Sequence, residues 1–278
     1  MGFHSLLRDR WRDSGSLLCV GLDPDRSRMP AAMARDRAGI ARFCKDIVDA
    51  TAEFACAFKP QVAYFAAEGA EAELEAVCAH ILENHPGIPL ILDAKRGDIG
   101  DTARMYAREA FERYGAHAVT VNPWMGGDTL APYQEHEGRG IVVLCRTSNP
   151  GSGEFQSLAA DGQPMYIHVA RRAATEWSKR GDVSLVVGAT YPAELAGVRA
   201  VVGDMPILVP GVGAQGGDPA EVVRSGAGPS GAGLIVNSSR AVLYADAADH
   251  MAGAARVARE TRDALNARSE EHTSELQS

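Results

Sequence analysis

Five charged residues lie at or just after the ends of three short apolar runs: Asp23, Lys59, Asp93, Lys95 and Asp98. Carboxylates and ammonium groups that lie together neutralise one another, which reduces the free-energy cost of burying them. A lysine in such a cluster can stabilise negative charge that develops on a substrate and can donate a proton to it. Asp98 could instead cap a helix and Asp23 could open a turn. Because three successive runs end in charge, we favour a shared site.

Lysine is rare in this chain, which makes its positions informative. Of the 28 basic residues 24 are arginine, and the lysines are Lys45, Lys59, Lys95 and Lys179. Arginine stays charged essentially always, whereas lysine can give up a proton. Chance retention explains any one lysine, but proton donation is a role that arginine does not fill. Lys95 is our candidate for the proton donor.

The elements that must position these residues follow from the hydrophobic pattern. Eight short apolar runs alternate with helical stretches, as where Ile40, Phe43, Cys44, Ile47 and Val48 recur at i, i+3, i+4, i+7 and i+8. This alternation predicts an α/β fold, a (β/α)8 TIM barrel in a single domain over residues 1–267; a doubly wound sheet is the alternative. The expected strands are 17–22, 56–60, 89–95, 118–122, 141–146, 184–189, 206–210 and 233–237. The other expected helices are near 62–84, 99–114, 126–136, 164–180, 192–200, 218–226 and 246–266.

In such a barrel the active site lies at the carboxyl ends of the strands, where the charged residues fall. Alternation along the third strand places Asp93 and Lys95 on one face. The segment 211–217, GVGAQGG, follows the seventh strand. It matches the dinucleotide-binding pattern but lacks the acidic residue that should end the next strand. We therefore expect it to bind phosphate through backbone N–H groups, with help from Arg240; a flexible turn is the alternative.

Two other segments differ from the repeating pattern. The connection 147–164, TSNPGSGEFQSLAADGQP, is long for a loop, so we expect either a functional lid or disorder. The last residues, 268–278 (RSEEHTSELQS), do not continue the helical pattern. They look like the translation of a sequencing adapter, and we expect a non-native tail.

Composition and motif searches exclude several classes of function. A net charge of −8 opposes binding to nucleic acid and to anionic membranes, so we expect neither partner. The five cysteines form no C-x-x-C pair, and the N-terminus lacks the apolar core of a signal peptide, which favours a reducing, cytoplasmic location. No zinc-protease, serine-hydrolase or P-loop motif occurs. His80 and His85 are five residues apart, which does not place them on one helix face, so we expect surface histidines and no metal site.

Several motifs in order resemble the orotidine 5'-phosphate decarboxylase family, and most closely its longer bacterial subgroup. They are GLDPD with Asp23, FKPQ with Lys59, DAKRGD at 93–98, TSNPG from Thr147, PGVGAQGGD from Pro210, and VNSSR ending at Arg240. The resemblance spans nearly the whole chain except the tail. It implies a dimeric barrel that converts orotidine monophosphate to uridine monophosphate and carbon dioxide in pyrimidine biosynthesis, without metal or cofactor.

The resemblance also assigns roles to individual residues. Asp98 and Thr102 would reach into the neighbouring subunit's site, Asp23 would hold the ribose with Lys59, Ser148 would contact the pyrimidine, and Gln215 and Arg240 would grip the phosphate. The charged network would comprise Lys59, Asp93, Lys95 and Asp98. The substrate-binding residues would be Asp23, Ile99, Thr102, Ser148, Pro210, Gln215, Gly216, Gly217 and Arg240.

Two alternatives remain. One is a metal-dependent sugar-phosphate decarboxylase or aldolase of the same superfamily, which shares the D-x-K-x-x-D stretch but holds its ion with an acidic group where this chain has Lys59. The other is a noncatalytic barrel that binds a phosphonucleotide. Lys95 argues against the second, because binding alone would tolerate arginine.

Overall fold

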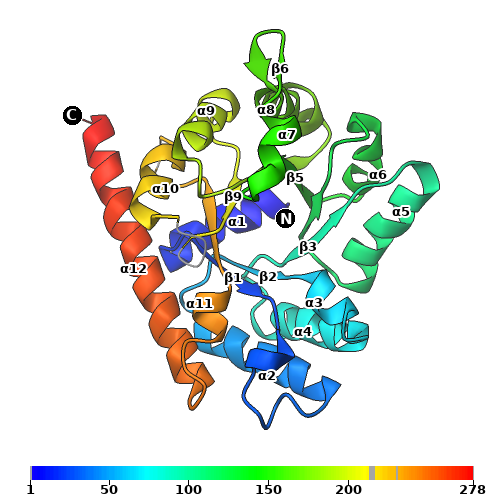
Figure 1. Cartoon of the computed structure of the whole chain (residues 1–278), viewed down its shortest axis with the longest axis vertical. Helices are drawn as coiled ribbons and strands as arrows, with labels where there is room; N and C mark the ends of the chain where they lie inside the picture. Colours follow the sequence, from blue (N-terminus) through cyan, green and yellow to red (C-terminus); the bar gives the residue numbers. More distant parts are fainter. Residues whose placement is uncertain (1, 213–216, 230, 278) are drawn as a thin grey trace.

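The computed structural model describes residues 2–212, 217–229 and 231–277, and within them eight parallel strands form a barrel (Figure 1). The pairing order is β2-β1-β10-β9-β8-β5-β4-β3. Two isolated parallel bridges, Phe58 with Leu90 and Gln61 with Asp93, join β2 to β3 and close the sheet. The strands are β1 (Leu18–Leu22), β2 (Ala57–Pro60), β3 (Ile91–Arg96), β4 (Ala118–Val121), β5 (Gly140–Arg146), β8 (Asp182–Val187), β9 (Ile207–Pro210) and β10 (Leu234–Ser238). The predicted (β/α)8 barrel is confirmed, and each strand lies within two residues of its predicted bounds.

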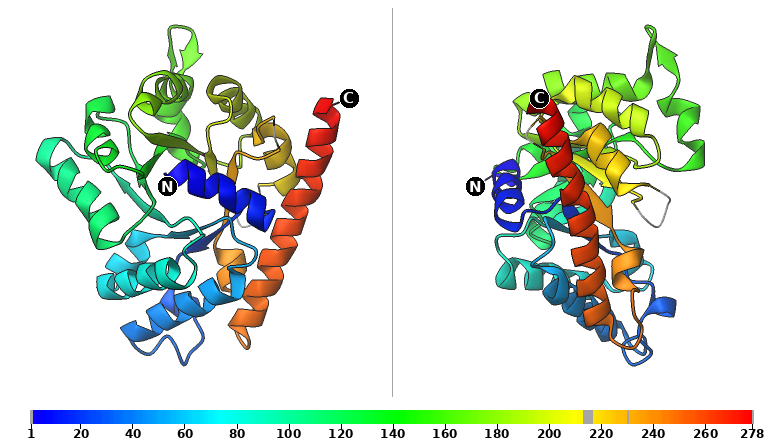
Figure 2. Two further views of the ribbon diagram at one scale, coloured as in Figure 1. Left: turned by 180° about the vertical axis from the view of Figure 1, so that it is seen from behind. Right: turned by 90° about the vertical axis from the view of Figure 1, so that its left-hand side faces the viewer.

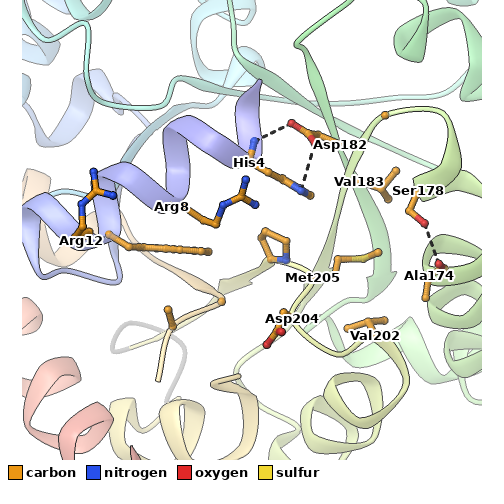
Figure 3. Close-up of a pocket in the computed structure, with 15 residues that line it drawn as sticks. His4, Arg8, Arg12, Ala174, Ser178, Asp182, Val183, Val202, Asp204 and Met205 are labelled. Atoms are coloured by element: carbon orange, nitrogen blue, oxygen red, sulfur yellow. Dashed lines mark hydrogen bonds and ion pairs between the residues drawn. The ribbon is translucent and has the colours of Figure 1, made fainter. Parts of the chain in front are cut away.

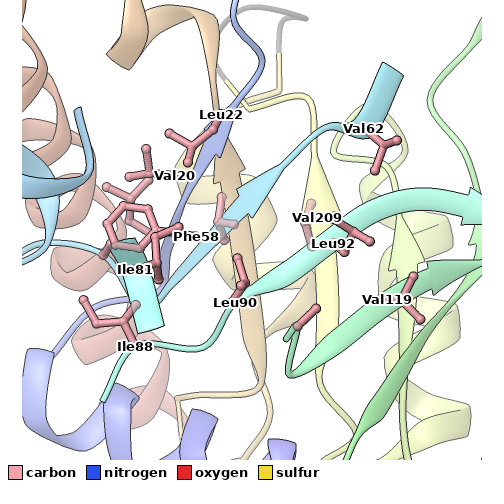
Figure 4. Packing of buried hydrophobic residues seen from close by; sticks show 14 of the residues in the cluster. Val20, Leu22, Phe58, Val62, Ile81, Ile88, Leu90, Leu92, Val119 and Val209 are labelled. Carbon is pink, nitrogen blue, oxygen red and sulfur yellow. The ribbon is translucent and has the colours of Figure 1, made fainter. Parts of the chain in front are cut away.

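Helices surround the barrel and cover its outer face. Outward-pointing residues such as Leu92 of β3 and Val119 of β4, together with Leu90 just before β3, pack against them in a large buried core, part of which Figure 4 shows. The major helices are α2 (Arg37–Thr51), α3 (Val62–Ala66), α4 (Glu71–Asn84), α5 (Gly100–Arg108), α6 (Ala131–Gln134), α8 (Met165–Thr175), α9 (Pro192–Val202), α10 (Pro219–Gly226), α11 (Arg240–Leu243) and α12 (His250–Gln277).

The helical predictions need three corrections. The helix expected over 62–84 is two helices, because Gly69 between them has a φ of +60°, which a helix cannot accommodate. The loop 147–164 is not disordered, since it contains a 3-10 turn (Pro150–Ser152), α7 (Gly153–Gln156) and the hairpin β6 (Ala159–Ala160) to β7 (Gln163–Pro164). The segment 268–277 continues α12, contrary to our expectation that the helix ends before it.

An N-terminal helix that the sequence analysis did not predict, α1 (Phe3–Ser14), lies across the end of the barrel where the strands begin (Figure 2). Its Phe3 and Leu7 are buried in a second core. That core contains one inward-pointing residue from each strand: Cys19, Ala57, Ile91, Ala118, Val142, Val186, Leu208 and Ile235. The helix therefore plugs the floor of the barrel. No helix among residues 2–212, 217–229 and 231–277 is long and apolar enough to cross a bilayer.

The plug predicts a specific loss of stability. Leu7→Ala removes a fully buried side chain, and the cavity left behind should lower the free energy of unfolding by about 3 kcal/mol, measured by urea denaturation. Arg8→Ala, at an exposed neighbouring position, should change it by less than about 0.5 kcal/mol. Equal effects of the two substitutions would show that α1 does not seal the barrel.

A charged cluster at the carboxyl ends of the strands

Asp93 lies at the centre of a buried cluster of charges at the upper rim of the barrel. Its Oδ2 accepts a hydrogen bond from Nζ of Lys59 at 2.8 Å, and its Oδ1 accepts one from Nζ of Lys95 at 2.6 Å. Lys59 and Asp93 are almost fully buried, whereas the side chain of Lys95 is 46% exposed. The cluster therefore presents one solvent-facing amine backed by a buried ion pair.

The electrostatics of the cluster keep Asp93 ionised. Burial alone would raise the pKa of Asp93, but the ammonium groups of Lys59 and Lys95 hold it well below its usual range. Burial likewise opposes charge on Lys59, yet Asp93 and then Asp23 raise its pKa above the ordinary value. The buried pair is thus fully charged at neutral pH.

Strand periodicity explains how the cluster forms above the apolar floor. Lys59 follows Ala57 by two residues, Asp93 follows Ile91 and Thr120 follows Ala118, so each points to the same inner face as its apolar predecessor. The hydroxyl of Thr120 donates to Oδ1 of Asp93 at 2.9 Å. An apolar layer from α1 and the lower strands thus supports a polar layer.

The backbone of Lys95 departs from regular strand geometry. The pairing of β3 with β4 shifts register between Leu92 and Arg96, and Lys95 has a φ of +46°. The hydroxyl of Thr120 accepts the amides of Ala94 and Lys95 at 3.0 and 2.9 Å, which stabilises this conformation. Our prediction that Lys95 joins Asp93 is confirmed, but the reason we gave, strand alternation, is wrong, because a bulge directs the amine. Thr120 was missed; its signal is a polar residue at an inward strand position.

Unsatisfied polar atoms lie beside the cluster on β1 and β10. Oδ1 of Asp23 and Oδ1 of Asn237 are buried without a hydrogen-bond partner among the described residues. Asp23 follows β1, which is paired with β2 so that Gly21 is opposite Lys59, and its charge acts on Lys59. Buried acceptors left without partners are costly, so both oxygens are positioned to bind a ligand's hydroxyl or amide groups.

The loop after β5 is fastened to the barrel by a buried arginine that the sequence analysis did not single out. The guanidinium of Arg146 hydrogen-bonds Glu194 of α9 and Ser152 of the loop. Its Cζ lies 4.1 Å from the ring centre of Tyr191. Ser148 is half-buried, and its backbone is so close to Gly188 that a Cβ there would come within 3.0 Å of it. The loop thus holds Ser148 at the rim.

The candidate phosphate-binding residues are partly described. Pro210 is the last residue of β9, and the amide of Gly217 donates to the carbonyl of Gly211 at 3.3 Å. A Cβ on Gly217 would lie 2.6 Å from that of Ala189, so this position requires glycine. Arg240 is exposed at the start of α11. Gln215 and Gly216 lie outside the described residues.

Asp98, Ile99 and Thr102 are not joined to the cluster within one subunit. Asp98 accepts the amide of Ile99 at 2.8 Å, and Ile99 and Thr102 are exposed at the start of α5. The alternative that Asp98 caps this helix is wrong, because Ile99 occupies the N-cap position and no side chain caps α5.

A cavity of about 760 Å³ lies at the opposite end of the barrel, beside α1 (Figure 3). Its lining includes His4, Arg8, Asp182 and Asp204. His4 donates its amide to Asp182, and burial lowers the pKa of its imidazole. Because barrels of this kind carry their chemistry at the carboxyl ends of the strands, we place the active site at the rim of Lys59, Asp93 and Lys95 instead.

The chain is similar to one family of known proteins over most of its length. A family model described as "Orotidine 5'-phosphate decarboxylase / HUMPS family" matches residues 16–256. A protein of Janthinobacterium sp. (strain Marseille) named orotidine 5'-phosphate decarboxylase is 57% identical over 267 residues, 96% of this chain and 98% of its own length. One of the same name from Dechloromonas aromatica is 57% identical, with 96% and 99% covered.

Solved structures share the architecture. The Leishmania donovani OMP decarboxylase structure aligns with a TM-score of 0.86 and 39% identity over 97% of this chain and 99% of its own. A Toxoplasma gondii structure titled as a putative orotidine-monophosphate-decarboxylase aligns with a TM-score of 0.88 and 34% identity over 97% and 98%.

The buried pair makes stability depend on Asp93 and on pH. Asp93→Asn leaves Lys59 buried beside a neutral partner, so the free energy of unfolding at pH 7 should fall by about 3 kcal/mol. The folded pKa of Asp93 is depressed below its unfolded value of about 3.9, so its contribution is complete above that pH and is lost as the pH falls further. Urea denaturation should therefore show the gap between the two proteins shrinking below about pH 4.

An exposed ion pair provides the control for this experiment. Glu176, whose side chain is 53% exposed, pairs with Arg172 of α8, and Glu176→Gln should change stability by less than about 1 kcal/mol. If the gap for Asp93→Asn stayed constant from pH 7 to pH 3, the pair would not be ionised as described.

Proposed function

The chain belongs to the orotidine 5'-phosphate decarboxylase / HUMPS family and is a decarboxylase of orotidine monophosphate; from this premise we propose that the cluster of Lys59, Asp93 and Lys95 carries out the reaction. The observation that carries the proposal is the exposed amine of Lys95, hydrogen-bonded to a carboxylate that a second, buried lysine keeps ionised. Such an amine can act both as a cation and as an acid at a reacting carbon.

The reaction needs a group that stabilises and then protonates the carbanion left when carbon dioxide departs. The bond between C6 of the pyrimidine and its carboxylate breaks, and the electron pair remains on C6. The ammonium of Lys95 stabilises this pair and transfers a proton to C6, which gives uridine monophosphate; the neutral amine then recovers a proton from water.

Asp93 acts on the bound substrate rather than on the proton. Its carboxylate is held in place by three hydrogen bonds, from Lys59, Lys95 and Thr120, and cannot turn away from a second carboxylate at the same site. The repulsion between the two negative charges disfavours the bound ground state and is relieved as carbon dioxide leaves. Binding energy from the distant phosphate offsets this strain.

The remaining contacts are proposed from position and from the family resemblance. The unpartnered oxygen of Asp23 would accept a ribose hydroxyl beside Lys59. Ser148 and Pro210 would border the base, while Arg240, Gln215 and the backbone of Gly216 and Gly217 would bind the phosphate. The free guanidinium of Arg240 supports this role, since no partner for it occurs among the residues described.

We place the active form as a homodimer in the cytoplasm. Apolar side chains lie exposed around α5 and the loop after β4, where Ile99 is 61%, Met105 52% and Trp124 71% exposed. A second subunit covering this surface would bury them and bring Asp98 and Thr102 to its own charged cluster. The five free cysteines, all buried, suit a reducing compartment.

The metal-dependent alternative is not favoured. An enzyme of that kind needs an acidic group at the end of β2 to hold its divalent ion. Lys59 occupies this place, and its ammonium is bonded to the Asp93 carboxylate that an ion would require. We propose no metal or cofactor for the reaction.

The role of Lys95 predicts a separation of binding from turnover. Lys95→Ala and Lys95→Arg should each lower kcat by at least about 1000-fold, because neither variant can supply a proton at C6. Binding of uridine monophosphate, measured by calorimetry, should persist. Lys179→Arg, at an exposed position remote from the rim, is the matched control and should retain full activity. Wild-type turnover by Lys95→Arg would refute the proposed role.

Shared sites predict complementation between two inactive variants. A heterodimer of one Lys95→Ala subunit and one Asp98→Ala subunit contains one intact site and one doubly substituted site. Purified through two different affinity tags, it should regain about half of the wild-type activity. If the heterodimer is as inactive as its parents, Asp98 serves its own subunit.

A further inference from the structure

Two histidines and one aspartate from neighbouring outer helices converge on a single point. Nε2 of His80, in α4, lies 2.7 Å from Oδ1 of Asp49, in α2, and Nε2 of His85 lies 2.8 Å from the same oxygen. The possible ligand atoms of these three residues all lie within 4.8 Å of one another. No other group of three or more His, Cys, Asp or Glu side chains meets this criterion among residues 2–212, 217–229 and 231–277. We call these three residues the α2–α4 triad.

The structure corrects the sequence-based interpretation of this pair of histidines. A continuous helix would separate residues five apart, but α4 ends at Asn84, and His85 has the non-helical backbone angles φ −133° and ψ 52°. Its ring therefore turns back toward that of His80, with 6.0 Å between the ring centres. Helix termination thus brings together two imidazoles that helical periodicity separates.

We propose that the α2–α4 triad binds a divalent transition-metal ion, with zinc as the preferred one. Two imidazole nitrogens and a carboxylate oxygen are a ligand set that zinc takes in proteins, with a water in the fourth position. Tetrahedral zinc with bonds of about 2.0–2.1 Å separates its ligand atoms by about 3.3 Å. The present separations of 2.7 and 2.8 Å therefore need to widen by about half an ångström at the carboxylate.

The surroundings of the triad suit an exchangeable ion. The side chains of His80 and His85 are 19% and 21% exposed, which fixes the rings, while Asp49 is 46% exposed and leaves a path for the ion. The amide of Asn84 lies 3.1 Å from Nδ1 of His80. The same amide nitrogen donates to the carbonyl of His80 at 3.0 Å. Ligation through Nε2 places the proton on Nδ1, so the exposed amide of Asn84 must turn its oxygen toward Nδ1 and exchange that bond for one with water.

The triad lies toward the end of the barrel opposite the charged cluster, so it takes no part in the decarboxylation. Asp49 is near the end of α2 and His80 near the end of α4, and the strands that follow these helices begin at the floor of the barrel. The charged cluster is at the opposite rim. The bound ion would cross-link α2 to α4 and stabilise the fold, so this inference is independent of the proposed function.

Zinc titration of the untagged protein, freed of metal with a chelator, tests the proposal. Calorimetry should show one strong site per chain, and zinc should raise the thermal midpoint by about 3 °C or more. Cobalt at the same site should give visible absorption bands typical of tetrahedral coordination. Asp49→Asn, a conservative change at an exposed position, and His85→Gln should each weaken binding by more than about tenfold and abolish the cobalt bands.

A histidine–aspartate pair elsewhere provides the matched control. Nε2 of His250 lies 3.0 Å from Oδ2 of Asp46, a pair with two ligands instead of three. His250→Ala should leave zinc affinity unchanged. If the wild type binds no zinc, or if Asp49→Asn binds it as tightly as the wild type, the triad is only a hydrogen-bonded link between two helices and the proposal is wrong.

Discussion

A carboxylate held between two ammonium groups at the seam of the barrel is the interaction on which the rest of this structure depends. The seam between β2 and β3 has two isolated bridges, and the ion pair of Lys59 with Asp93 crosses it. Closing the barrel therefore also assembles the charges. If both lysines were absent, burial would raise the pKa of Asp93 and favour its protonated form. The site would then lose the fixed negative charge that opposes a substrate carboxylate.

The inward-pointing side chains of the barrel form two layers, because every second residue of a strand points inward. The lower layer supports the fold and the upper layer carries the charged groups of the site. The lower layer is apolar and is sealed by Phe3 and Leu7 of α1. The upper layer contains Lys59, Asp93 and Thr120. Lys95 breaks the period, because its backbone adopts a left-handed conformation that costs about 1–3 kcal/mol in a non-glycine residue. Thr120 helps to maintain this strain with its two amide hydrogen bonds, and the result is an exposed amine aimed at the reacting group.

Periodicity and motif order were sufficient for the strands and for bringing Lys59 and Asp93 together, because strand ends in a closed barrel must meet at one rim. They were insufficient wherever a single backbone conformation decides the outcome. The bulge at Lys95 has no signal in the strand pattern. The end of α4 at Asn84 does have one that we overlooked, since His85 precedes Pro86 and a residue before proline is disfavoured in the helical conformation. The hairpin in the loop after β5 also had a local signal that we overlooked, since Asp161 and Gly162, both with positive φ, form the two-residue turn that Asp-Gly favours.

The most direct test of the account is a spectrophotometric assay of orotidine monophosphate decarboxylation, with and without a chelator. The account predicts rapid loss of the substrate at the same rate in both conditions, because charged side chains alone perform the chemistry at the rim, even when the chelator removes zinc from the α2–α4 triad. Turnover that stops with the chelator and returns with a divalent ion would contradict it, as would the absence of any turnover.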